Sequence, residues 1–218
     1  LPRAAWRADP RASASPDDWQ KRDGYRLRPG VKLPLTDALT LEAEASSARE
    51  DQHADYVSFG SRSDRSKDML SFTPRLRWRR GFGGLASETV FGLDHYDGDA
   101  RYTTAPRQSA EQTSTAAYFQ NTTSLTEAWA VTLGGRSQRM AQSAHQDAYA
   151  PWFSPAMDGS ATRRRNAWDL GASYNGGHWR AYGKIGTTFR FANTDELFGF
   201  NPLTGNPAFA GDLRPQHG

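Results

Sequence analysis

The 218-residue sequence predicts an all-β protein, an antiparallel up-and-down meander of about eight strands. Apolar and polar residues alternate with a period of two along much of the chain, which is the pattern of a strand with one apolar face. Short turns alternate with long polar segments, as in a chain of hairpins. Aromatic residues make up 12% of the chain although only 37% is hydrophobic, which disfavours both disorder and a conventional soluble core.

The segment FTPRLRWRR at residues 72–80 shows the alternation most clearly. Leu76 and Trp78 fall on one face, whereas Arg75, Arg77 and Arg79 fall on the other. The same pattern predicts strands within seven further segments, of which 114–124 is the weakest and is supported by its place between two others. These segments are 25–33, 38–46, 87–95, 114–124, 128–136, 167–175 and 178–190.

Tight turns and long connections alternate between the expected strands. The tight turns lie at 33–37, 80–84, 124–128 and 175–178, and the long polar segments at 47–67, 98–112, 141–163 and 192–218. Short turns at one end and long loops at the other are the layout of an outer-membrane barrel. We therefore expect residues 1–218 to be one fragment of a transmembrane β-barrel domain. Its expected parts are a preceding loop (1–23), four hairpins (24–191) and an extracellular loop (192–218).

The row of arginines opposite Trp78 also indicates a membrane barrel. In such a barrel the apolar face meets lipid and the polar face meets a wet lumen, so the arginines need no dry partner. Trp129, Trp168 and Trp179 stand near strand ends, as an aromatic girdle requires. A soluble β-sandwich binding module would show a similar alternation and is an alternative interpretation.

Composition narrows the possible functions. The chain contains no cysteine, and its basic residues are dispersed at a formal net charge of +3, which disfavours nucleic-acid binding. Its five histidines have no metal-ligand spacing, and DHYDGD at 94–99 lacks the residue order of a calcium loop. No catalytic motif for a hydrolase or nucleotide enzyme is present. We therefore expect no enzyme, no metal site and no cofactor.

The last part of the chain resembles the barrel of TonB-dependent outer-membrane receptors. TTFRFANTDELFGF at 187–200 and GNPAFAGDLRPQ at 205–216 resemble the family's segments "FRAPxxxELYG" and "NPxLxPE". Residues 196–199, 206–207 and 213–215 match these motifs. Residues 191–193 depart from Arg-Ala-Pro, and Gln216 replaces the usual Glu. Two upstream segments, 115–136 and 70–80, are also similar to strands of this family.

The resemblance implies a partial barrel without its plug domain, taken from a barrel of about 22 strands. It also implies a Gram-negative outer-membrane location and active uptake of a ligand such as a ferric siderophore. The implied partners are outer-membrane lipid, the small-molecule ligand, and TonB acting through the missing plug domain. A small outer-membrane barrel acting as a pore or adhesin is a further alternative.

Candidate ligand residues lie at the loop end of the expected barrel. Four stand where the last strand meets its loop: Arg190, Asn193, Glu196 and Phe198. Three aromatic residues of the long polar segments, Tyr102, Tyr149 and Trp152, are candidates to stack on a flat ligand. In the alternative interpretation these aromatics pack the loops, and Glu196 bonds backbone amides of its own turn.

The arginines of the polar face are a second group of interest. They could attract an anionic ferric chelate, or they could pair with carboxylates of the same face, which is a common way to fill a wet lumen. The arginines are Arg26, Arg28, Arg75, Arg77, Arg79, Arg180 and Arg190. The expected acidic partners are Glu42, Glu44, Glu88, Asp94 and Asp169.

Overall fold

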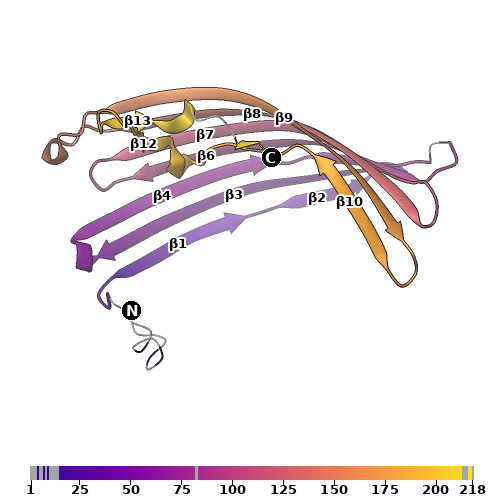
Figure 1. Cartoon of the computed structure of the whole chain (residues 1–218), viewed down its shortest axis with the longest axis horizontal. Coiled ribbons are helices and arrows are strands. Elements are labelled where there is room, and N and C mark those ends of the chain that lie inside the picture. The colour runs from indigo at the N-terminus through magenta and orange to yellow at the C-terminus, as the bar shows by residue number, and fades with distance from the viewer. Residues whose placement is uncertain are drawn as a thin grey trace.

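The computed structural model describes residues 15–81, 83–212 and 216–217, together with residues 4, 7 and 9. Its main feature is a ten-stranded antiparallel sheet in the order β1-β3-β4-β6-β7-β8-β9-β10, with β2 paired to β3 and β5 paired to β3 and β6 (Figure 1). The strands are β1 (Trp19–Leu27), β2 (Gly30–Pro34), β3 (Leu39–Tyr56), β4 (Ser61–Phe72), β5 (Arg75–Arg79), β6 (Ser87–Tyr102), β7 (Gln108–Ser124), β8 (Trp129–Gln146), β9 (Met157–Asn175) and β10 (Arg180–Gly186). The predicted antiparallel meander is confirmed.

Two prolines divide what would otherwise be continuous strands. Pro29 separates β1 from β2, and Pro74 lies between β4 and β5. Proline has no N–H to donate to the ladder, so the strand assignment breaks at these positions. The carbonyl of Pro29 still accepts from Ala45 N at 3.0 Å, and that of Pro74 accepts from Leu93 N at 3.0 Å. The ten strands thus form eight ribbons, in agreement with the sequence prediction.

The tight turns gather at one end of the sheet (Figure 1). Two of them share a sequence pattern, with Thr36 and Thr126 each preceded by leucine and followed by an acidic residue and alanine. The Thr36 hydroxyl accepts from Leu39 N at 3.1 Å, and the Thr126 hydroxyl accepts from Trp129 N at 3.0 Å. A threonine hydroxyl that bonds its own turn favours this tight reversal, so the position of these turns follows from local sequence.

The long loops expected at 47–67, 98–112 and 141–163 are wrong for most of their length. β3 continues to Tyr56, β6 to Tyr102 and β8 to Gln146, and only 57–60, 103–107 and 147–156 connect these strands to their neighbours. The preceding loop is also shorter than expected, because β1 begins at Trp19. In these regions the outward face is mostly polar, and the inner face mixes alanines with polar residues. The period-two signal is therefore lost, whereas the backbone ladder does not depend on it.

The two faces of the sheet differ as predicted. Cross-strand pairs of apolar residues, such as Leu76 with Phe91 and Leu133 with Leu170, lie on the outward face. Phe91, Leu133 and Leu170 are exposed and Leu76 is half-buried in this chain, which suits contact with lipid. We call this band of outward apolar side chains the apolar belt. Among the described residues, no helix is long and apolar enough to cross a membrane.

The segment expected as an extracellular loop at 192–218 has structure of its own. It follows β11 (Phe189–Arg190) and contains the 3-10 turns η3 (Thr194–Leu197) and η4 (Ala210–Asp212) and the hairpin of β12 (Phe198–Phe200) and β13 (Pro207–Phe209). β11 pairs with β14 (Gln216–His217). Residues 213–215 of the family motif lie outside the described residues.

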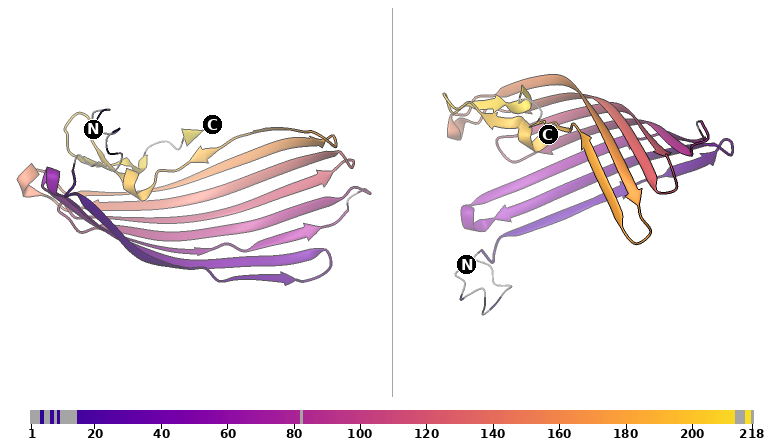
Figure 2. Two further views of the ribbon diagram at one scale, coloured as in Figure 1. Left: turned by 90° about the horizontal axis from the view of Figure 1, so that it is seen from below. Right: turned by 45° about the vertical axis from the view of Figure 1, so that its right-hand side comes forward.

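We call residues 191–212 the strap, because they fold back over the concave inner face of the sheet (Figure 2). Leu197 of the strap is fully buried, in a cluster with Ala110, Ala144 and Met157 of the long strands. The alanines are small enough to leave room for it. The strap is therefore packed onto the sheet at the end opposite the tight turns.

Candidate ligand site on the inner face

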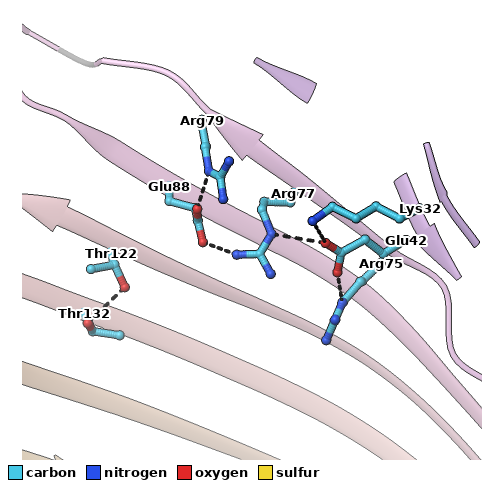
Figure 3. A network of polar contacts seen from close by, with 8 residues as sticks. All are labelled: Lys32, Glu42, Arg75, Arg77, Arg79, Glu88, Thr122 and Thr132. Atoms are coloured by element: carbon cyan, nitrogen blue, oxygen red, sulfur yellow. Dashed lines mark hydrogen bonds and ion pairs between the residues drawn. The ribbon is translucent and has the colours of Figure 1, made fainter. Parts of the chain in front are cut away.

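The inner face carries an ion-pair network near the tight turns (Figure 3). The Glu42 carboxylate accepts from Arg75 Nε at 2.5 Å, and Lys32 Nζ lies 3.6 Å from it. Arg77 joins Glu42, at 3.7 Å, to Glu88. Arg79 Nε donates to the same Glu88 at 2.7 Å. Because three of the predicted arginines share two carboxylates, the pairing interpretation accounts for them without a ligand.

Other inner charges are paired in the same way. Arg28 lies 3.3 Å from Glu44, and Lys184 lies 3.3 Å from Asp169. In the part of the chain that the structure describes, Arg26 and Arg180 form no ion pair. At the same end of β7 and β8 the inner face carries hydroxyl groups in place of charged groups. Thr122 Oγ1 and Thr132 Oγ1 are hydrogen-bonded at 3.1 Å (Figure 3).

Asp94 is paired with Arg136, whose Nη1 donates to it at 2.6 Å. The Arg136 guanidinium also lies over the ring of Tyr118, 5.8 Å from its centroid. That ring crosses Gly92, where an added Cβ would stand 2.2 Å from Tyr118 Cζ. Gly92 therefore provides the space in which this aromatic residue lies flat against the sheet.

A second polar group lies at the other end of the inner face, beneath the strap. The Asp195 carboxylate, carried by η3, lies 3.0 Å from Lys67 Nζ and 3.3 Å from Arg65 Nη1. The Tyr102 hydroxyl donates to the same carboxylate. Arg65 and Lys67 come from β4, and Tyr102 is the last residue of β6, directly opposite Arg65. We call these four residues and Phe198 the Asp195 cluster.

An aromatic edge completes the Asp195 cluster. The rings of Tyr102 and Phe198 meet edge to face with centroids 6.0 Å apart. The Arg65 guanidinium lies over the Tyr102 ring, 5.8 Å from its centroid. Two cations and the phenol of Tyr102 thus surround one carboxylate, and the Phe198 ring packs against that phenol.

The cluster lies outside the apolar belt, and it perturbs the ionisation of its own members. Burial favours a raised pKa for Asp195, but the Tyr102 hydroxyl and the Lys67 ammonium outweigh it and hold this pKa below its usual value. Burial, followed by the hydrogen bond to Asp195, raises the pKa of Tyr102 to about 12. At neutral pH the phenol is therefore a donor and Asp195 is an anion. The N–H and O–H groups that donate to this carboxylate can instead bind an anionic oxygen group of another molecule.

Three of the predicted ligand residues form a separate set at the start of the strap: Arg190 of β11, and Asn193 and Glu196 of the strap itself. Arg190 Nη2 lies 2.5 Å from Glu196 Oε1, and Asn193 N donates to Glu196 Oε2 at 2.9 Å. Asn193 and Glu196 form a capping box that opens η3. The Arg190 guanidinium and the Asn193 amide lower the pKa of Glu196. These contacts fix the turn that presents Asp195, as the structural interpretation of Glu196 expected.

The predicted aromatic residues are divided between two places. Tyr102 and Phe198 belong to the Asp195 cluster. Tyr149 pairs with Ser154 in the β8–β9 connection, where Trp152 lies in η2 (Ala150–Trp152). The structure brings neither of these two into the cluster.

Arg65, Lys67 and Asp195 were not among the predicted site residues. The first two lie in a segment that the polar composition predicts as loop. Their spacing of two residues would place them on one face of a strand, and this is the signal that could have found them. Asp195 meets them across 128 to 130 residues of sequence, for which one sequence offers no signal. Among the described residues, no group of three or more His, Asp or Glu is placed to hold a metal ion.

Comparison with solved structures shows where this architecture occurs. The closed form of the ferric-catecholate import receptor Fiu from Escherichia coli K12 has a TM-score of 0.76 and 12% identity, over 93% of this chain and 38% of Fiu. The siderophore receptor PiuA from Acinetobacter baumannii has a TM-score of 0.72 and 12% identity, over 88% of this chain and 36% of PiuA. The alcaligin outer-membrane receptor FauA from Bordetella pertussis has a TM-score of 0.66 and 17% identity, over 81% of this chain and 30% of FauA.

At such identities the likeness shows the fold alone, and the chain spans less than two fifths of the length of each of these receptors. No curated protein matches the chain. A family model described as "TonB dependent receptor-like, beta-barrel" matches residues 2–218. This family and the similar structures are transport receptors of the Gram-negative outer membrane rather than enzymes. The chain belongs to the TonB-dependent receptor family, as part of its outer-membrane β-barrel domain.

Proposed function

We propose that this chain is part of a transporter that takes up an anionic ferric siderophore, and that the Asp195 cluster forms part of its ligand site. The observation that carries the proposal is the Asp195 carboxylate held by Lys67, Arg65 and Tyr102. Ferric siderophores commonly bind iron through carboxylate or catecholate oxygens. These are acceptors of the same kind as the carboxylate already held there.

In this proposal the ligand exchanges with Asp195. The two cations of β4 attract the anionic chelate to the loop end of the lumen. Its oxygens replace the Asp195 carboxylate on Lys67 and Arg65, and its flat surface meets the rings of Tyr102 and Phe198. Ligand binding is thereby coupled to displacement of the strap.

The other predicted residues have supporting roles in the proposal. Arg190, Asn193 and Glu196 shape the η3 turn and thus set the position of Asp195. Tyr149 and Trp152 are proposed as further contacts for a flat ligand, from the β8–β9 connection. Transport through the pore would use a plug domain and TonB, as the family implies.

The test uses the full-length receptor that contains this segment. We would replace Arg65→Gln and Lys67→Gln together and measure fluorescence quenching by three ferric complexes: a tris-catecholate, citrate and an uncharged trihydroxamate. The matched control is the double variant Arg77→Gln and Arg79→Gln, which removes two cations from the inner face at its other end.

The proposal expects the first double variant to bind the anionic complexes at least about tenfold more weakly, since each charge-assisted hydrogen bond contributes about 1.5–3 kcal/mol. The control should bind them within about twofold of the wild type. Unchanged binding in the first variant, or an equal loss for the uncharged complex, would refute this site. Loss of iron uptake with binding intact would instead point to the transport step.

A further inference from the structure

Two arginines face each other on the outward side of the sheet. Arg139 of β8 and Arg164 of β9 are direct partners in the antiparallel register, and both are exposed. They share their face with Leu133 and Leu170 of the apolar belt, because even spacings along a strand stay on one side. The intervening Met140 is buried on the inner face.

This pair has no counter-ion in the described part of the chain. The outward positions around the pair on β7, β8 and β9 are uncharged: Thr115, Ser137, Ala141, Thr162 and Asn166. The one side-chain bond that either guanidinium makes there is from Arg164 Nε to Ser137 Oγ, at 3.1 Å. Like charges directly opposite each other destabilise a sheet. The pair therefore carries an unfavourable interaction that nothing nearby in the described chain offsets.

Other outward arginines of the sheet are neutralised locally. Arg49 Nε lies 2.9 Å from Asp51, and its Nη1 lies 3.8 Å from Asp68. Arg101 Nε lies 3.3 Å from Asp99. The absence of a carboxylate beside Arg139 and Arg164 is thus a local property of β8 and β9.

The distance of the pair from the aromatic girdle, measured along the strands, indicates its depth in the membrane. Trp129 and Tyr174 are cross-strand partners near the tight turns, where the aromatic girdle lies. Arg139 and Arg164 lie ten residues further along each strand (129 to 139 and 174 to 164). At about 3.3 Å per residue and a tilt of about 40°, this is roughly 25 Å, which is the height of the apolar band of such barrels. The pair lies at the outer headgroup level.

We propose that Arg139 and Arg164 together bind a phosphate group of a lipid in the outer leaflet. Two guanidinium groups on adjacent strands can each donate two hydrogen bonds to the oxygens of one phosphate. The bound phosphate turns the repulsion between the arginines into two attractions. A lipid phosphate fits better than a dissolved one, because the pair faces the bilayer at the level where lipid headgroups lie.

The experiment uses the full-length receptor after removal of lipid in detergent. It is incubated with bisphosphorylated lipid A, and the fraction carrying bound lipid is measured by native mass spectrometry. The double variant Arg139→Gln, Arg164→Gln is compared with Arg49→Gln, Arg101→Gln, which removes two charges from the same face. No siderophore is present, so the result is independent of the proposed uptake function.

We expect the Arg139 and Arg164 double variant to retain at least about tenfold less lipid A, and the control to retain it within about twofold. Enzymatically dephosphorylated lipid should bind the wild type and the double variant equally. A double variant with Arg139→Lys and Arg164→Lys should retain an amount of lipid A between those of the wild type and the glutamine variant. Lysine keeps the charge but not the paired donors. Equal retention of lipid A by the glutamine variant, or full displacement by millimolar inorganic phosphate, would overturn the proposal.

Discussion

Lys67 Nζ and Asp195 Oδ1 lie 3.0 Å apart, although 128 residues separate the two in sequence. This ion pair joins β4 near one edge of the sheet to the strap that follows the last long strand. Leu197, two residues further on, is buried against alanines of β7 and β8. The strap is therefore held by both electrostatic and apolar contacts, and each kind can be tested separately.

Replacement of Leu197 by alanine should loosen the strap. The side chain is fully buried, and loss of such a side chain costs about 2–5 kcal/mol. Hydrogen exchange of residues 194–200 in the full-length receptor should become faster in this variant. Leu203→Ala is the matched control, because Leu203 in the same strap is 93% exposed. Equal exchange in the two variants would show that burial of Leu197 does not hold the strap.

Acid should release the strap only at low pH. The pKa of Asp195 is lowered in the folded protein, so its contribution is complete above the unfolded value of about 3.9 and is lost as pH falls through the lower folded value. The Tyr102 proton is lost only as pH rises towards about 12. A spin label at Thr204 should therefore keep constant mobility from about pH 5 to 9 and become mobile below about pH 4.

The variant Asp195→Asn provides the comparison for this titration. It should show a looser strap at neutral pH and retain only the smaller acid transition of Glu196, whose pKa is lowered beside Arg190. A transition near pH 6 in the wild type would contradict the assignment to these carboxylates.

Gly159 of β9 should tolerate no side chain. A Cβ at this position would stand 2.2 Å from Phe209 Cγ, so Gly159→Ala must displace the aromatic ring of the strap. We expect a loss of about 1–3 kcal/mol in strap docking, which is the usual cost of overpacking. Faster proteinase K cleavage within residues 198–209 would report it. Gly183→Ala in β10 is the control, since a Cβ there has nothing within 4 Å and should leave the cleavage rate unchanged.

Glu42 and Glu44, the inner glutamates at the tight-turn end of β3, should differ in their effect on stability. Glu42 has a side chain only 13% exposed and serves three cations, so Glu42→Gln should lower the free energy of unfolding by about 1.5–3 kcal/mol. Glu44 is 47% exposed and pairs only with Arg28 in the described chain, so Glu44→Gln should cost about 0–1 kcal/mol. Urea unfolding of the refolded receptor measures both. A cost for Glu44→Gln equal to that for Glu42→Gln would contradict the network as the structure shows it.

The faces and turns of the sheet could be predicted from sequence because their signals are local. Alternation around Trp78 assigns Leu76 to the outward face and Arg77 to the inner face, and the register agrees. The turn at Thr126 has its own threonine hydroxyl to close it. Lipid on one side and water on the other impose the same pattern on every strand within the apolar belt.

The outer half of the strands and the strap could not be predicted in this way. Beyond the apolar belt the outward face meets water, so the part of β4 that carries Arg65 and Lys67, residues 61–68, has a polar composition. Leu197 packs against Ala110 and Ala144, and nothing near these alanines in the sequence indicates a partner so far along the chain. The Asp195 cluster depends on both of these features and was therefore only partly anticipated, through Tyr102 and Phe198.

The length of β6 has a consequence for access from outside the cell. Thr89, opposite Trp78, marks the inner girdle, and Tyr102 lies 13 residues further along the strand (89 to 102). With the same rise and tilt this corresponds to roughly 33 Å, so the Asp195 cluster stands about 8 Å above the apolar band. A molecule too large to enter the pore, such as an antibody fragment, can approach this rim without crossing the lipid. Under the proposed function, a fragment bound at this rim would block ligand loading from outside the cell.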